Sequence, residues 1–386
     1  MGKTVSGFRA KRLFALVFLL TLTGAAWLFA ADNPITFTPP VLHGSDPSLP
    51  AIQTEINRII KQQETLFRNE FQGLTSDPQK MIGAFASSSV FSSTGASLRT
   101  YQGYDTFALT LGFMGGVQLP VDVFSMFSGG EDVMNKIYND FTNNGDIPFG
   151  VNPQIINVQA GINTSKFLLN GLYFGFKAGF MSLPLDLGDF STSFLTWSAG
   201  VMANYQILRQ WRVGGGLFVW RGLNIGAGLI YQRTNLKLNV PLELESDDYI
   251  YIPSYSVSVR IADPELRMNF LVNTITIPLE AVTAIRLLGF FNISLGAGAD
   301  VGFGSANLNT DGHADIRLYG LPAGTSVTDG SITISMGGEN TPSLLNPKAM
   351  ASLGISLGPV ILLDIPVTYY FLNYGYNIGL SLGFTL

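Results

Sequence analysis

The sequence predicts an all-β transmembrane antiparallel barrel of about ten strands, preceded by an N-terminal helical or plug segment. Three observations lead to this fold class. After the first thirty residues, no apolar run is long enough for a helix to cross a bilayer. The chain is nevertheless 47% hydrophobic and only 13% charged, about half the charge of a soluble domain. Strands of alternating polarity recur along it, and a closed barrel satisfies every backbone amide in lipid.

Residues 1–30 are predicted to be a signal peptide that is removed on export. The first twelve residues carry basic side chains and no acid, and residues 13–31 are uncharged. This stretch could also span a bilayer uncleaved. Asp32-Asn33-Pro34, which follows it, suits a mature N-terminus better than a continuing helix.

Residues 31–104 are predicted to be a periplasmic helix and a plug. Apolar residues at helical spacing predict an amphipathic helix from Leu49 to Phe71. The stretch from Ile82 to Gly103 is rich in Gly, Ser and Ala, and we expect it to enter the lumen as a strand while the helix stays at the periplasmic mouth. The alternative is a flexible periplasmic tether without contact to the barrel.

Residues 105–386 are predicted to form the barrel. From Tyr376 to Leu386 every even position is apolar or aromatic, and every odd position is Asn, Gly, Ser or Thr, so one face meets lipid and the other the lumen. The same alternation predicts nine further strands, at 107–117, 156–162, 172–180, 195–207, 223–231, 275–285, 291–303, 349–357 and 361–369. Residues 209–221 could hide another pair, which leaves totals of about twelve to fourteen open.

Connection lengths predict the orientation of the barrel. Short turns near 164–167, 286–289 and 358–359 are expected in the periplasm, where the last strand would also end. The longest and most polar stretches, at 119–151, 239–264 and 307–346, are expected as surface-exposed loops outside. The predicted location is therefore the bacterial outer membrane.

Strand parity places six charged side chains on the lumen face: Lys177, Glu280, Arg286, Asp300, Lys348 and Asp364. Both signs are present, so they form either a stabilising network or a pathway that selects solutes by charge. Outward aromatics near strand ends are expected to form an interface girdle: Trp197, Tyr205, Tyr231, Tyr369 and Phe371.

Other chemistry finds little support, and we predict no catalytic, cofactor or metal site. The chain has no cysteine and only two histidines, so thiolate chemistry and histidine clusters are excluded. His313 with Asp311 or Asp315 could imitate the acid and histidine pair of an outer-membrane hydrolase. The two glycines of Gly296-Ala297-Gly298 lie at positions that face the lumen, and no helix pattern follows them. Both observations argue against a nucleotide-binding loop. The net charge of −5 argues against nucleic acid as a partner.

The signal, the segment before the barrel and the closing strands LDIPVTYYF and NIGLSLGFTL together resemble barrels of the long-chain fatty-acid transporter (FadL-like) type, particularly those of spirochaetes. The resemblance implies a gated channel or transporter for small or hydrophobic molecules. A surface-exposed structural or adhesin barrel is the alternative, and an outer-membrane hydrolase is a third, less favoured one. Expected partners are outer-membrane lipid, a small or hydrophobic solute, and the barrel-assembly machinery acting on the C-terminal strand.

Overall fold

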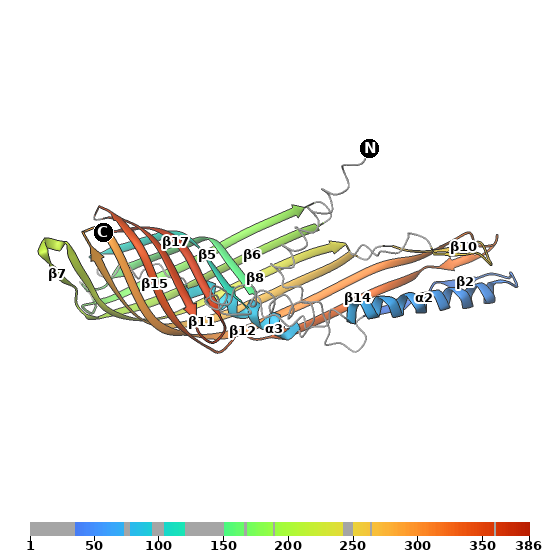
Figure 1. Ribbon diagram of the computed structural model, residues 1–386, viewed down its shortest axis with the longest axis horizontal. Coiled ribbons are helices and arrows are strands. Elements are labelled where there is room, and N and C mark those ends of the chain that lie inside the picture. The colour runs from blue at the N-terminus through green and yellow to red at the C-terminus, as the bar shows by residue number, and fades with distance from the viewer. Residues whose placement is uncertain are drawn as a thin grey trace, which may run out of the picture.

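The computed structural model describes residues 35–72, 78–94, 104–119, 150–165, 168–187, 190–241, 250–262, 265–358 and 360–386. The predicted signal peptide, residues 95–103 of the predicted plug and most of the predicted loop at 119–151 lie outside these ranges. The described residues form an antiparallel barrel, and a long sheet with a helix beside it continues from one end of the barrel (Figure 1).

Ten strands form the barrel, and each of the ten predicted segments lies in one of them. In ring order they are β3 (Phe107–Gln118), β4 (Gly150–Asn163), β5 (Leu172–Leu187), β6 (Phe190–Leu208), β8 (Phe218–Pro241), β11 (Glu265–Leu287), β12 (Phe291–Tyr319), β15 (Leu345–Leu357), β16 (Ile361–Tyr370) and β17 (Gly375–Thr385). The ring closes where β17 pairs with β3. Residues 209–221 add no further barrel strands, because β7 (Trp211–Val213) and the turn η2 (Gly214–Gly216) only fold back against the start of β8.

The faces of the barrel wall follow the predicted alternation. On β17, Leu380 and Leu382 are 37% and 40% exposed, whereas Ser381 between them is 5% exposed. The outer surface is apolar around the ring and the inner surface is polar, which is the distribution that a wall between lipid and lumen requires. The alternation therefore determines which side chains reach the interior.

A sheet extends beyond the barrel because β8, β11 and β12 are about twice as long as a tilted membrane strand needs. The distal half of β12 leaves β15 and pairs with β14 (Gly330–Asn340), which in turn pairs with β1 (Ile35–Thr38). Shorter strands complete this end of the molecule: β9 (Ile250–Ile252), β10 (Val257–Ile261), and the pair β2 (Val41–His43) and β13 (Ser326–Thr328). We call this part, with the distal halves of β8, β11 and β12, the extension.

The prediction that 239–264 and 307–346 are loops was wrong for most of their described residues, which are strands of the extension. The error has a physical cause on β12. Odd positions face outward along its whole length, but they change from apolar, as in Leu295 and Phe303, to polar, as in Asp311 and Arg317. The inward face changes the other way, from Asp300 to Ile316. A strand that passes from lipid into water must reverse its polarity in this way, and the outward polar half resembled a loop.

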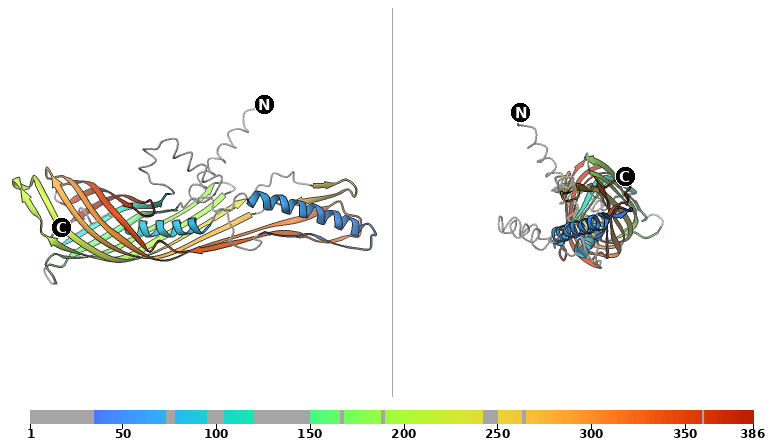
Figure 2. Two further views of the ribbon diagram at one scale, coloured as in Figure 1. Left: turned by 60° about the horizontal axis from the view of Figure 1, so that its bottom comes forward. Right: turned by 90° about the vertical axis from the view of Figure 1, so that its right-hand side faces the viewer.

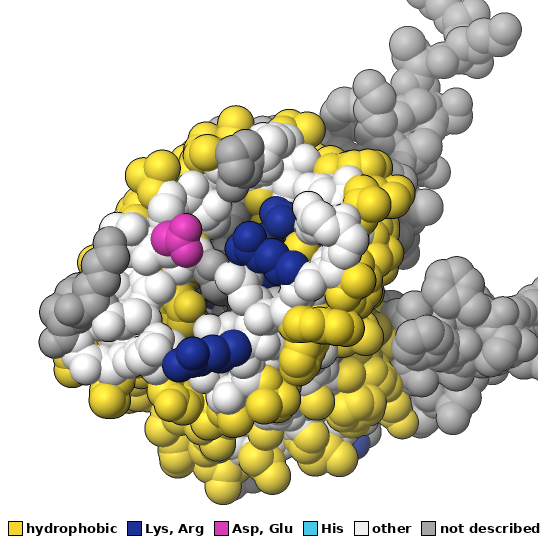
Figure 3. Space-filling view, turned by 90° about the vertical axis from the view of Figure 1, so that its left-hand side faces the viewer, with side chains coloured by type: hydrophobic (Ala, Val, Ile, Leu, Met, Phe, Trp, Pro, Cys, Tyr) yellow, Lys and Arg dark blue, Asp and Glu magenta, His cyan; other side chains and the backbone are white. Residues whose placement is uncertain are grey.

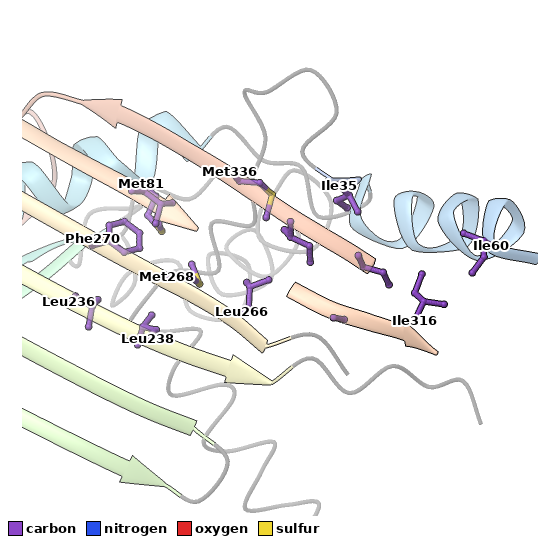
Figure 4. Packing of buried hydrophobic residues seen from close by; sticks show 14 of the residues in the cluster. Ile35, Ile60, Met81, Leu236, Leu238, Leu266, Met268, Phe270, Ile316 and Met336 are labelled. Atoms are coloured by element: carbon purple, nitrogen blue, oxygen red, sulfur yellow. The ribbon is translucent and has the colours of Figure 1, made fainter. Parts of the chain in front are cut away.

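Helix α2 (Leu49–Gln72) confirms the predicted amphipathic helix and covers the inner face of the extension. Its apolar stripe consists of Leu49, Ile52, Ile56, Ile59 and Ile60, each less than 9% exposed. They join a cluster with side chains of β8, β11, β12 and β14, among them Leu266, Phe270 and Ile316 (Figure 4). Burial of such side chains contributes about 1.5–3 kcal/mol each.

The extension lies at the end of the barrel opposite Leu386 (Figure 1). Two of the predictions therefore exclude each other. Either the last strand ends in the periplasm, or α2 lies at the periplasmic mouth. None of the helices within the described ranges is long and apolar enough to cross a membrane.

Candidate functional site

Helix α3 (Pro78–Thr94) lies inside the barrel, next to the extension (Figure 2). It contacts β3, β4, β8, β11, β12 and β17 around the ring, as well as β14. Described side chains from Ala84 to Ser93 are almost completely buried. The lumen is therefore filled at this level by the segment before the barrel.

The expectation that this segment would be a strand was wrong. Every strand of the ring already pairs with two neighbours, so the wall offers no free edge to a further strand. Buried backbone amides must then be satisfied within the segment itself, which a helix does.

Small residues let the helix lie directly against the wall. A Cβ at Gly116 on β3 would lie 2.4 Å from the carbonyl oxygen of Ser88, and one at Gly150 on β4 would lie 2.3 Å from that of Ala84. Any side chain at these two wall positions would collide with the backbone of α3. The inward glycines thus make room for the helix.

Serine hydroxyls attach α3 to β11 and β8. The hydroxyls of Ser89 and Thr274 lie 3.0 Å apart, and Ser93 donates to Thr276 over 3.0 Å. Ser92 accepts a hydrogen bond from the amide of Gln232 at 2.9 Å. Such hydrogen bonds are each worth about 0.5–1.5 kcal/mol net, so together they hold the helix without covalent attachment.

Gln232 also organises a polar collar on the wall beside the helix. Its amide nitrogen donates to Asn152 at 2.9 Å, and its amide oxygen accepts from Gln154 at 2.8 Å. Asn152 donates to Thr234 at 2.7 Å. The sequence prediction named only charged lumen residues and did not include this collar. Inward parity on β8 marks Gln232 and Thr234, whereas Asn152 and Gln154 lie before the predicted strand at 156–162, where a register shift changes the parity of β4.

Lys177, predicted to face the lumen, lies at the C-terminal end of α3. Its side chain is fully buried, and its ammonium donates to the carbonyl of Ser93. The last carbonyls of a helix have no partner within the helix and carry partial negative charge, so a cation is stabilised there. Asn377 on β17 donates to the carbonyl of Phe91 in the same last turn.

Three of the predicted lumen residues meet beneath α3. The ammonium of Lys348 contacts the carboxylate of Glu280 and lies 2.6 Å from that of Asp300. Tyr370 donates to the second oxygen of Asp300 at 2.8 Å, and its ring stacks on Phe91 of α3 with centroids 4.0 Å apart. We call Lys348, Glu280, Asp300 and Tyr370 the charge cluster. It links the wall to the plugging helix through the Tyr370 ring.

The remaining two predicted residues lie elsewhere. Asp364 is fully buried on β16, in register with Ser381 and Gly354. Arg286 lies near the end of β11 and lines a 420 Å³ cavity at the mouth opposite the extension. The six predicted residues thus occupy several levels of the interior instead of one site.

The histidine considered for catalysis lies on the outward face of β12. His313 is 3.2 Å from Asp315, whose other oxygen accepts from Arg317 at 2.8 Å. These two hydrogen bonds, with that from Arg317 the larger, lower the pKa of Asp315 below its usual value. All three side chains are solvent-exposed on a flat sheet face, an arrangement of surface ion pairs. Among the described residues, no group of His, Cys, Asp and Glu could hold a metal ion.

A closed ring with an apolar exterior, a polar interior and a helix in its lumen defines a plugged transmembrane β-barrel. The model of the Lsa36-like family matches residues 35–385, so the chain belongs to this family. No curated protein matches the sequence.

Similar solved structures include barrels of two kinds. The translocator domain of the autotransporter NalP from Neisseria meningitidis is 7% identical with a TM-score of 0.29, covering 73% of this chain and 89% of that one. The toluene transporter TodX from Pseudomonas putida is 10% identical with a TM-score of 0.25, covering 81% and 98%. The toluene transporter TbuX from Ralstonia pickettii is 8% identical with a TM-score of 0.24, covering 75% and 91%. The two transporters are of the FadL-like type that the sequence resembles.

Proposed function

We propose that this protein is a gated channel of the bacterial outer membrane for small or hydrophobic molecules, with α3 as its gate. The observation that carries the proposal is the attachment of α3. The helix fills the lumen, yet it is fixed by noncovalent contacts with a polar wall that can be replaced by water. Displacing it would leave a passage lined by Asn, Gln, Ser and Thr side chains.

A groove on the outer wall supports the proposal that the transported molecule is hydrophobic. It has a volume of about 540 Å³ and lies where β3 and β4 shift register between Gly112 and Met114. Its lining is mostly apolar, with Leu111, Phe113 and Ile156 exposed toward the membrane side. An apolar molecule dissolved in lipid would find a concave surface here.

A reversible crosslink tests the gate, because the chain has no cysteine of its own. Ser89→Cys with Thr274→Cys replaces two hydroxyls that lie 3.0 Å apart, one on α3 and one on the wall. In planar bilayers we expect the oxidised variant to remain closed and the reduced one to open intermittently. Removal of residues 78–94 should give a larger and constant conductance.

The matched control joins two wall strands without touching α3. Ser294→Cys with Ser352→Cys connects β12 to β15, where the two native hydroxyls are already in contact. Oxidation of this pair should leave conductance unchanged. If the variant lacking residues 78–94 conducts no better than the wild-type protein, the channel proposal fails.

The extension favours a second candidate, a protein that displays this part at the cell surface. Its outer face is polar and its inner face is covered by α2, so it is a water-exposed body well beyond the bilayer. Binding of the intact protein to host molecules, lost when the distal extension is altered but unaffected by the Ser89–Thr274 crosslink, would favour display over transport.

A further inference from the structure

The mouth of the barrel opposite the extension contains a cavity with a concentration of positive charge. Basic side chains gather around a hollow at this end of the molecule (Figure 3). The cavity of about 420 Å³ is lined by Arg212, Arg221 and Arg286, with Asp105 as its one acidic side chain among the described lining residues. We call this cavity the arginine basin.

The backbone is built so that Arg221 points into the basin. On β8 the inward residues are even-numbered, such as Asn224 and Gly226, so regular pairing would place residue 221 on the lipid side. A shift of register between Thr283 and Ile285 of β11 interrupts this pattern and turns Arg221 inward. Bulges at barrel rims commonly redirect a side chain in this way.

Specific contacts hold the bulge. Gly222 has a φ of +83°, and a Cβ there would lie 2.0 Å from the carbonyl oxygen of Leu208. Thr283 donates to the carbonyl of Gly222 at 2.8 Å and accepts from the indole of Trp220 at 2.8 Å. The local geometry that brings a second cation beside Arg286 is therefore fixed by its neighbours.

Arg286 retains unused hydrogen-bonding capacity. Its Nε is buried and has no hydrogen-bond partner among the described residues. A guanidinium presents five donors in a planar fork that matches the oxygens of phosphate or carboxylate groups. Like charges held together in a partly enclosed space repel each other, and a bound anion removes that repulsion.

We propose that the arginine basin binds a phosphate group. A phosphate monoester carries a charge of about −1.5 to −2 at neutral pH and three acceptor oxygens, so it can pair with more than one guanidinium fork, whereas a single carboxylate has only two oxygens and one charge. Apolar lining residues such as Val219 and Leu362 leave room for the organic part of an ester. The group could belong to a soluble phosphate compound or to a lipid headgroup. The site does not depend on conduction through the barrel.

Calorimetric titration of the full mature protein, in detergent and phosphate-free buffer, tests the proposal with two probes. Inorganic phosphate represents the soluble source, and dihexanoyl phosphatidic acid represents the lipid headgroup. We expect at least one probe to bind, and Arg286→Gln to weaken that binding at least tenfold. Binding of phosphate indicates a soluble ligand, whereas binding of the phospholipid alone indicates a headgroup.

Two further variants control the result. Arg286→Lys keeps the charge but loses the fork, so it should weaken binding less than Arg286→Gln does. Arg267→Gln removes an exposed arginine of the extension and should change nothing. Strand content by circular dichroism and the gel shift on heating establish that each barrel is closed. The proposal is overturned if neither probe binds, or if closed Arg286→Gln barrels bind as tightly as the wild-type protein does.

Discussion

Lys348 is the residue on which the charge cluster depends, because one ammonium faces the carboxylates of Glu280 and Asp300 in the barrel interior. Lys348→Met would leave both carboxylates buried without a cation. Removing one member of a buried ion pair costs about 3–5 kcal/mol. We expect a loss of that size in the free energy of unfolding by urea, followed by tryptophan fluorescence in lipid vesicles.

The control for this prediction is an ion pair on the extension. Arg267 lies 3.1 Å from Glu265, and both side chains are more than half exposed, so Arg267→Met should cost less than about 1 kcal/mol. Replacing Lys348, Glu280 and Asp300 together by Met, Gln and Asn should recover part of the stability, because no charge is then left buried. Equal losses for Lys348→Met and Arg267→Met would contradict the role of the cluster.

At the scale of elements, the sequence predicts the strands of the wall better than the helix in the lumen. Wall strands alternate between lipid and lumen, and this period of two is visible in the sequence. Helix α3 is enclosed on all sides, so apolar residues such as Ile82 and Phe91 and polar ones such as Ser88 are equally buried. It has no apolar stripe, and its helical state follows from the closed ring around it, which local sequence does not reveal.

Neighbouring glycines on β3 provide a test of the plug. Gly116 faces α3, and a side chain there would meet the backbone of Ser88 and Ser92, whereas a Cβ at Gly115 has nothing within 4 Å. Gly116→Leu should therefore displace α3 and raise conductance. Gly115→Leu adds the same side chain to the outer surface and should do neither. If both variants remain as closed as the wild-type protein, α3 does not depend on this contact.

For the whole molecule, the reversal of polarity marks where the bilayer ends. Near this level Tyr231 lies 5.2 Å from Trp197 between ring centroids and donates to Asn273 at 3.0 Å. Aromatic side chains with a polar edge favour the interface between lipid and water. Beyond it most outward residues of β8, β11 and β12 are polar. Length and composition predict a barrel, but they do not predict the extension. The extension depends on β12 pairing first with β15 and then with β14, and composition does not show such a change of partner.

The path of the chain leads to a prediction about sidedness. α2 lies on the extension, α3 lies inside the ring, and β3 begins at the opposite mouth, where Thr106 bonds to Leu386. Residues 35–72 and the start of β3 therefore lie at opposite ends of the barrel, and α3 lies in the lumen between them. Labelling with a membrane-impermeant maleimide shows which side of the membrane each part occupies. Single cysteines are placed at three solvent-exposed positions: Lys61 of α2, Asp311 of β12 and Phe290 of the β11–β12 turn. If the last strand ends in the periplasm, Lys61→Cys and Asp311→Cys should be labelled on intact cells, and Phe290→Cys only after the outer membrane is permeabilised. Labelling of Phe290→Cys together with Lys61→Cys, while Asp311→Cys stays protected, would mean that the N-terminal segment does not pass through its own barrel.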